Sequence, residues 1–333
     1  MPLGRLLLRQ WFVLALVAVL VLGATLARSE SRGADPSVVA RLADVKLLRQ
    51  LVVAGVMFVM AWPVPTRELL QTLRAPWAAL VATAINIGLL PPVAFGLAQL
   101  GHPELGLGLI IVGSIPSTLA SGAVWTRRAG GNDATAILVT LITNGTCFIV
   151  APMWLTLLTG RQLQGQLDVV PMIRELVLLV VTPMAAGQLL RLSADLSAWA
   201  TRHKWTLAVT AQVGILWMVF VGALQCGRQI YGLSAEPLAN APPTAAEMAL
   251  MLTSVVAMHL GAFAVGWVVS RRLGFARPDC IAVGIAGSQK TLMIGLQLAI
   301  THYGGFSILP LVAYHVLQLL IDAMLAEWLR PKD

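Results

Sequence analysis

The chain has 333 residues, of which 58% are hydrophobic and only 11% are charged, and its formal net charge is +8. In soluble domains about a quarter of all residues are charged. The composition of this chain therefore excludes an ordinary soluble protein and predicts a polytopic membrane protein. The basic residues are scattered between apolar stretches, which argues against a nucleic-acid-binding face. The three cysteines are far apart and form no disulfide or metal-binding pattern, so we expect no cofactor and no metal.

The N-terminal segment allows two interpretations. Arg5 and Arg9 precede an apolar block that ends in the sequence GATLARSES, a pattern that resembles a signal peptide and its cleavage site. However, the run from Gln10 to Ala27 carries no charge and is long enough to span a bilayer. We therefore interpret it as the first transmembrane helix.

Charge-free windows separated by turn residues predict ten membrane spans. Their approximate ranges are 10–28, 48–66, 75–99, 104–126, 134–159, 172–190, 204–225, 245–270, 278–302 and 305–328. The connecting segments on one side, both termini included, carry 14 Lys and Arg, and those on the other side carry 8. This bias predicts a multi-pass protein of the cell membrane (plasma or inner) with both termini in the cytoplasm. Residues 28–49 are an exception with five basic residues, partly offset by Glu30, Asp35 and Asp44.

The fourth and the ninth spans contain polar interruptions. Pro116 breaks the fourth among serine and threonine residues, and the ninth has the sequence GIAGSQKTLMIGL at its centre. Thr118-Leu119-x-x-Gly122 matches Thr291-Leu292-x-x-Gly295. Interrupted helices at the same place in two five-helix halves predict inverted repeats, residues 1–160 and 161–333, with a binding site between them.

Lys290 lies in the middle of the ninth span. Asp279 and His302 are the nearest charged or ionisable residues along the chain, eleven and twelve residues away, or about 16–18 Å of helix. A lysine side chain cannot reach the membrane interface over that distance. Ionisable residues inside a membrane mark functional sites by default, so we interpret Lys290 as functional.

These segments resemble the bile acid:sodium symporter superfamily, in its divergent SBF-like branch. The resemblance covers nearly the whole chain and is sharpest in SIPSTLASGAVWTRRAGGNDATAILVTLITN, SQKTLMIGL and YHVLQLLID. It implies ten helices, with helices 1, 2, 6 and 7 in a panel domain and helices 3–5 and 8–10 in a core domain. Helices four and nine are then broken and cross near the membrane midplane. It further implies secondary transport of a small organic anion by elevator-like alternating access.

The sequence departs from the sodium-coupled members where they bind sodium. Their fourth-helix break reads roughly Pro-Gly-Gly-Thr-x-Ser-Asn, so the resemblance places Gly122 where they have a sodium-ligating asparagine. A serine ligand falls at Ala136, although a threonine ligand is retained as Thr140. Their ninth-helix break has a glutamate before Gln-Asn, whereas this chain has Ala286-Gly-Ser-Gln-Lys290. The segment has lost an anionic oxygen and gained an ammonium.

Three roles for Lys290 follow. Its ammonium could replace the ion and bind Ser121, Thr140 and unwound backbone carbonyls. It could instead be the counter-charge of an anionic substrate, assisted by the N-termini of the half-helices. Proton coupling is the third role, because burial disfavours the charged form of a lysine. A sodium ion beside the ammonium would be unfavourable, so we expect a transporter that is not sodium-coupled. The alternative is a sodium- or proton-coupled symporter of bile acid-like or carboxylate solutes.

The candidate substrate- or ion-binding residues share a polar side chain inside the interrupted helices or the spans that follow them. They are Lys290, Ser117, Thr118, Ser121, Thr140, Asn144, Ser288, Gln289, Thr291, His315 and Gln318. His315 could relay a proton or merely hydrogen-bond a neighbouring helix. Asp322, near the cytoplasmic end of the last span, is interpreted as structural, and His259 as forming an interhelical hydrogen bond. Apart from substrate and lipid bilayer, proton coupling and a homodimer are left open as partners.

Rival classes explain less. An intramembrane enzyme could use Ser288 and Lys290 as nucleophile and base, but residues two apart point to different sides of a helix. A retinal-binding lysine would need a nearby carboxylate, which the centres of the preceding spans do not offer. We therefore expect that the protein is not an enzyme.

Overall fold

The computed structural model describes residues 11–64, 76–119, 121–160, 169–233 and 241–330, and every regular element in these ranges is a helix. The first half contains α2 (Trp11–Ser31), α3 (Val38–Asp44), α4 (Lys46–Ala61), α6 (Trp77–Thr83), η1 (Ala84–Leu89), α7 (Leu90–Ala98), α8 (Pro103–Ser114), α9 (Ser121–Arg128) and α10 (Asp133–Thr159). The second half contains α11 (Val169–Leu176), η2 (Val177–Val181), α12 (Thr182–Leu190), α13 (Ala194–Arg202), α14 (Lys204–Ile230), α15 (Ala245–Arg272), α16 (Arg277–Ser288), α17 (Leu292–Leu298), η3 (Ala299–Tyr303), η4 (Gly305–Ser307) and α18 (Ile308–Leu329).

The molecule is a polytopic membrane protein. Seven helices of the described ranges are long and apolar enough to cross a membrane. The three other predicted spans are α4, with 16 residues, and the two interrupted helices, whose halves are too short to qualify individually. The count of ten therefore stays a prediction. Several predicted details lie outside the described residues: Arg5, Arg9, the start at Gln10, the end of the second span at 65–66, and the start of the second repeat at 161.

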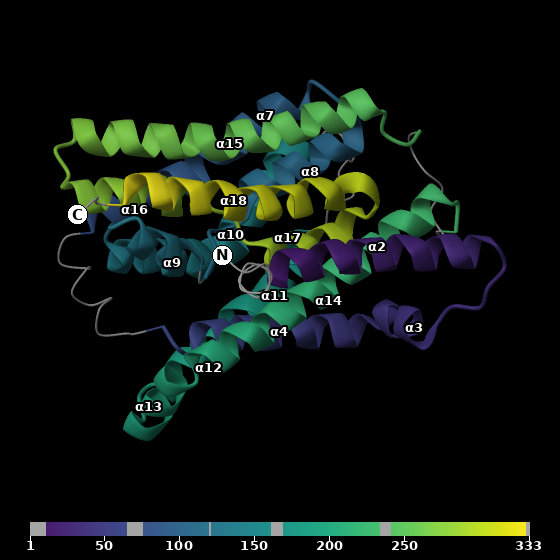
Figure 1. The fold of residues 1–333 in the computed structure, drawn as a ribbon, viewed down its shortest axis with the longest axis horizontal. Coiled ribbons are helices and arrows are strands. Elements are labelled where there is room, and N and C mark those ends of the chain that lie inside the picture. Colours follow the sequence, from purple (N-terminus) through teal and green to yellow (C-terminus); the bar gives the residue numbers. More distant parts are fainter. Residues whose placement is uncertain (1–10, 65–75, 120, 161–168, 234–240, 331–333) are drawn as a thin grey trace, which may run out of the picture.

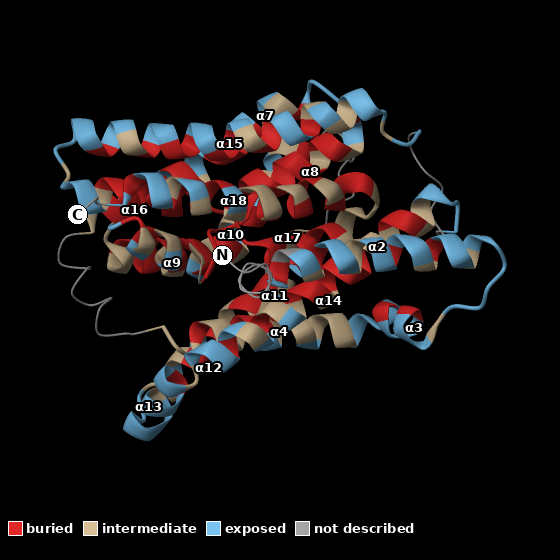
Figure 2. Ribbon diagram, in the orientation of Figure 1, coloured by how far each residue is buried: buried red, intermediate tan, exposed pale blue. Residues whose placement is uncertain are grey.

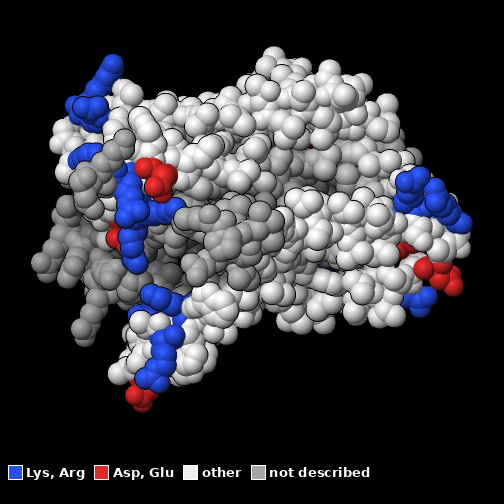
Figure 3. All heavy atoms as spheres, viewed as in Figure 1, with Lys and Arg blue, Asp and Glu red and all other residues white. Residues whose placement is uncertain are grey.

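Charged residues gather at the two ends of the molecule, and a broad uncharged belt lies between them in the view of Figure 3. Such a belt is what a lipid bilayer requires, because charges are costly in its hydrocarbon core. At one end, Arg228 binds Glu30 and Asp44, each at 2.7 Å. Glu30 and Asp44, two of the acids that offset the basic excess of residues 28–49, thus neutralise Arg228, whose side chain is largely buried.

The helices pack in two groups (Figure 1). The first group contains α2, α3, α4, α11, η2, α12, α13 and α14. Its closest pair is α2 and α14, where Gly23 faces Ala223 and Gly227 faces Ala27, so small residues let the two backbones approach. The second group contains α6, η1, α7, α8, α9, α10, α15, α16 and α18, while α17 lies at the boundary and contacts α14, α4 and α18. Figure 2 shows that burial is deepest on α8 and α17, in the interior.

Both predicted interruptions are present, with different causes. After α8, Ile115 is extended (φ −81°, ψ 159°) because the following Pro116 disfavours helical geometry in the residue before it. After α16, Gln289 is equally extended (φ −74°, ψ 147°) without any proline. Hydrogen bonds from other helices must hold this second break open.

Candidate functional site

The two breaks contact each other in the interior. The backbone N–H of Thr291 donates to the carbonyl of Pro116 at 2.9 Å, and the Ser117 hydroxyl donates to the carbonyl of Ala286 at 3.0 Å. We call the extended residues 115–119 and 289–291 the crossing. All of these residues are buried, so their free backbone groups require partners from protein.

Each break is held by the helix that follows it. The backbone N–H of Lys290 donates to Gln318 Oε1, and Gln318 Nε2 donates to the carbonyl of Lys290, both at 2.9 Å. In the first break, Ser117 N–H donates to Thr143 Oγ1 at 3.2 Å and Asn144 Nδ2 donates to the carbonyl of Ser117 at 2.9 Å. The repeat match that pairs Thr118 with Thr291 also pairs Ser117 with Lys290. The two residues that this sequence match pairs are therefore braced by similar hydrogen bonds.

The Lys290 ammonium is surrounded by backbone oxygens. Nζ donates to the carbonyls of Asn86 at 2.6 Å and of Gly113 and Ile115 at 2.7 Å, and Asn86 Oδ1 lies 3.3 Å away. We call these oxygens the carbonyl cage. An ammonium has three N–H groups, and the three shortest contacts match them. The residue is only 2% exposed, so in this conformation its ammonium is directed at protein oxygens and not at a cavity.

The sequence makes these carbonyls available. Gly113 and Ile115 lie at the C-terminal end of α8, where helix carbonyls lack intrahelical donors and the helix dipole is negative. In η1, Leu90 N–H bonds to Ile85, five residues back, and the next two residues are Pro91 and Pro92, which have no N–H. The carbonyl of Asn86 is thus free for Lys290. That of Ile87 accepts from Trp154 Nε1 at 2.7 Å.

Asn86 joins the second break to the cage. Its side-chain amide donates to the carbonyls of Gln289 at 2.7 Å and Gly287 at 3.1 Å, at the end of α16. The residue is fully buried and sits in a π-helical turn, a geometry that often marks functional sites. Asn86 was absent from the sequence-predicted site. The Pro-Pro pair that follows a lone mid-span asparagine was the available signal.

A second polar cluster surrounds the side chain of Gln289, the residue before Lys290. The hydroxyls of Thr118 and Ser121 donate to Gln289 Oε1, and Gln289 Nε2 donates to Asp322 Oδ2 at 2.5 Å. A Cβ at Gly122 would lie 3.3 Å from Gln289 Oε1, so glycine leaves room for this amide. Gln289 therefore lies over the position where the resemblance places an asparagine in sodium-coupled proteins.

Asp322 is fully buried in this cluster, although the sequence placed it near a helix end and assigned it a structural role. Its Oδ1 lies 3.1 Å from His259 Nε2, and His259 Nδ1 faces the carbonyl of Ser288 at 3.3 Å. Both ring nitrogens face acceptors, so the ring can donate to either the carboxylate or the carbonyl. The interhelical hydrogen bond expected of His259 is present. Asp322 binds Gln289 and His259, whereas the ammonium of Lys290 binds the carbonyl cage.

The remaining predicted residues divide into members of the crossing and neighbours. Thr140 Oγ1 donates to the carbonyl of Thr118 at 2.8 Å, and Ser288 donates to Ile285 within its own helix. His315 is hydrogen-bonded to Gln318, which braces the crossing, with 3.1 Å between His315 Nδ1 and Gln318 Nε2. The expectation that Ser121 and Thr140 bind the ammonium was wrong. Their hydroxyls are taken by Gln289 and the Thr118 carbonyl, while the predicted unwound carbonyls do bind it.

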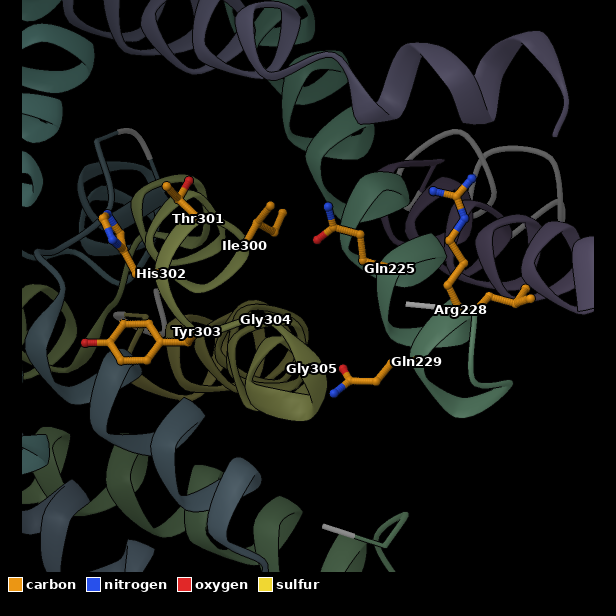
Figure 4. Close-up of a pocket in the computed structure, with 10 residues that line it drawn as sticks. Gln225, Arg228, Gln229, Ile300, Thr301, His302, Tyr303, Gly304 and Gly305 are labelled. Atoms are coloured by element: carbon orange, nitrogen blue, oxygen red, sulfur yellow. The ribbon is translucent and has the colours of Figure 1, made fainter. Parts of the chain in front are cut away.

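A cavity of about 470 Å³ lies between α14 and the turn after α17. Figure 4 shows Gln225 and Gln229 extending from α14 towards Ile300 and the Gly304–Gly305 pair. Its two basic lining residues are already paired, Arg228 with Glu30 and Asp44, and His302 with Glu175 at 2.8 Å. The cavity wall is polar but its charges are compensated.

Comparison with known proteins identifies one family of membrane transporters. The family model of the SBF-like CPA transporter family matches residues 10–331. The uncharacterized protein PA2026 of Pseudomonas aeruginosa is 28% identical over 86% of this chain and 80% of its own length. The uncharacterized sodium-dependent transporter YocS of Bacillus subtilis is 25% identical over 82% and 80%. The probable sodium/metabolite cotransporter BASS4, chloroplastic, of Oryza sativa subsp. indica is 27% identical over 84% and 68%.

Proposed function

The chain belongs to the SBF-like CPA transporter family, and we propose that it is a secondary transporter that moves a small organic anion by alternating access without sodium coupling. The family consists of transporters, so the protein is not an enzyme. The names of two relatives ascribe sodium dependence and sodium/metabolite cotransport to those proteins. The proposal for this chain therefore depends on how its crossing differs from that of sodium-coupled proteins.

The observation that supports this proposal is that the Lys290 ammonium donates to three carbonyls of the cage. An ammonium and a sodium ion carry the same charge and both are stabilised by carbonyl oxygens. A sodium ion 4 Å from the ammonium would be repelled by about 4 kcal/mol at an effective dielectric of 20. We propose that Lys290 is a tethered cation that makes the crossing permanently occupied, so its role as substrate counter-charge is the weaker hypothesis.

The packing of the helices supports the proposed mechanism. The first group contains the predicted spans 1, 2, 6 and 7, which would form the panel, and the second contains spans 3–5 and 8–10, which would form the core. The equivalent bracing of Ser117 and Lys290 supports the inverted repeats. In this proposal the core carries the crossing past the panel, both termini are cytoplasmic, and the membrane is the cell membrane.

Uptake into proteoliposomes tests the coupling. Small carboxylates are first screened by thermal shift on the purified protein, and the strongest stabiliser is used as the radiolabelled probe. We expect the same initial uptake rate with an inward sodium gradient, an inward potassium gradient and choline. The sodium-dependent Bacillus subtilis relative, assayed with the same gradients, is the positive control for the sodium response. A severalfold acceleration by sodium alone would refute the proposal.

Proton coupling is the second candidate, favoured by the buried pair of Asp322 and His259. The same proteoliposome uptake assay tests it. An inward proton gradient should then accelerate uptake of the probe, and Asp322→Asn should abolish this acceleration while uptake without a gradient remains. Equal rates with and without the proton gradient would exclude this candidate.

A further inference from the structure

Outside the crossing, Glu175 links the first helix group to the second half of the ninth span. This carboxylate belongs to α11 of the first group. Its Oε1 accepts from Gln297 Nε2 at 2.5 Å and Thr301 Oγ1 at 3.4 Å, and its Oε2 lies 2.8 Å from His302 Nε2. All three partners belong to α17 and η3, the second half of the ninth span. The Glu175 side chain is only 10% exposed, and that of His302 is 17% exposed.

The amide of Gln297 is oriented by this carboxylate. Gln297 Oε1 is buried and has no partner among the described residues, whereas its Nε2 donates to Glu175 and lies 3.0 Å from Thr301. A buried amide oxygen without a donor costs free energy. The strong bond from the amide nitrogen to a charged oxygen offsets that cost, which indicates that this contact holds the second half of the ninth span in place.

The charges around Glu175 come from the first group. Lys46 and Arg49 of α4 interact electrostatically with it, and Arg49 also interacts with Asp44, a partner of Arg228. His302 is the ionisable side chain that η3 contributes to this set. One charged network of the first group therefore binds the moving half of the ninth span through Glu175.

The boundary at this point combines an apolar contact with a polar cavity: Ile300 of η3 packs against a cluster that includes Phe220 and Leu224 of α14. Thr301 and His302 line the 470 Å³ cavity together with Gln225 and Gln229 of α14. Figure 4 shows Thr301 and His302 on one wall and the two glutamines on the other. Because part of this boundary is a cavity, the bonds of Glu175 add polar attachment beside the apolar contact of Ile300.

We propose that Glu175 is a latch that holds the core against the panel in the conformation described, and that its release limits the exchange between the two faces of the membrane. The inference rests on the proposed function, since it requires the core to move past the panel. Every such movement must break the bonds of Glu175 to Gln297, Thr301 and His302. Glu175 then acts as a positioning residue, because it contacts helix nine and not the crossing.

Spin-label distances between the groups test the latch without a transported solute. The buried cysteines Cys147, Cys226 and Cys280 are replaced by alanine, and labels are attached at Trp205→Cys in α14 and Trp328→Cys in α18. The native side chains there are 75% and 73% exposed. The distance distribution is measured by pulsed electron paramagnetic resonance in nanodiscs. Glu175→Gln keeps the shape but removes the charge, and Asp195→Asn, an exposed carboxylate on α13, is the matched control.

We expect the distribution to contain a second distance, from the released conformation. Relative to the labelled parent, its population should rise roughly tenfold in Glu175→Gln, rise less in His302→Gln, and be unchanged in Asp195→Asn. A second distance that is populated equally in the parent and in Glu175→Gln would overturn the latch but leave alternating access standing. One single distance in every variant, with and without the strongest stabiliser of the thermal-shift screen, would overturn both proposals.

Discussion

At the scale of single residues, Lys290 shows how a membrane interior can accommodate a charge without a carboxylate partner. The cage supplies three carbonyl dipoles, two of them at the negative end of α8. The buried carboxylate of Asp322 is bound by Gln289 and His259 and not by the ammonium. The ammonium and the cage are thus mutually dependent: neither is stable in the interior without the other.

Lys290→Met measures that dependence. Methionine has a similar length, so the change removes the ammonium and leaves three buried carbonyls without donors. The unpaired carbonyls cost about 1–3 kcal/mol each, partly offset because the charge no longer has to be desolvated. We expect a net destabilisation of about 2 kcal/mol, seen as a lower midpoint of thermal unfolding in detergent. Lys204→Met, at an exposed lysine of α14, should leave the midpoint unchanged, and equal midpoints for both variants would contradict the account.

At the scale of elements, the sequence was most informative where a break has a local cause. Pro116 and the repeat of Thr118-Leu119-x-x-Gly122 identified both interruptions. The polar residues predicted there include Ser117, Thr118, Gln289, Lys290 and Thr291 of the crossing. The partners of Lys290 were harder to predict. A free carbonyl has no side-chain signature, and that of Asn86 becomes available only because η1 shifts its hydrogen bonds before Pro91. Glu175 was missed because its partners lie more than 120 residues away.

Pro91→Ala tests the role of η1. Alanine supplies an N–H that can bond to the carbonyls of residues 86 or 87, so it competes with Lys290 for the cage. Removing a proline from a helix interior normally stabilises the helix. Here we expect the reverse, a loss of about 1 kcal/mol. Pro152→Ala in α10 is the matched control, because Pro152 is also buried inside a long helix. The account fails if both changes raise the unfolding midpoint alike.

At the scale of the whole molecule, two groups of helices meet at a boundary that is partly a polar cavity. Near this boundary the first group carries two charged clusters, Arg228 with its two acids and Glu175 with its basic neighbours. The second group carries the crossing with Lys290. A transporter built in this way would keep its cation within the moving part throughout the cycle, and the substrate alone would change sides.

Sodium-dependent stability tests this account most directly. The unfolding midpoint of the purified wild type and of Lys290→Ala is measured over a range of sodium chloride, with potassium or choline chloride at the same ionic strength. A ligand that binds only the folded state raises the midpoint. The account predicts no sodium-specific rise for the wild type. It predicts a rise for Lys290→Ala with sodium or methylammonium, because either cation can occupy the emptied carbonyl cage. A sodium-specific rise in the wild type at millimolar concentrations would contradict it.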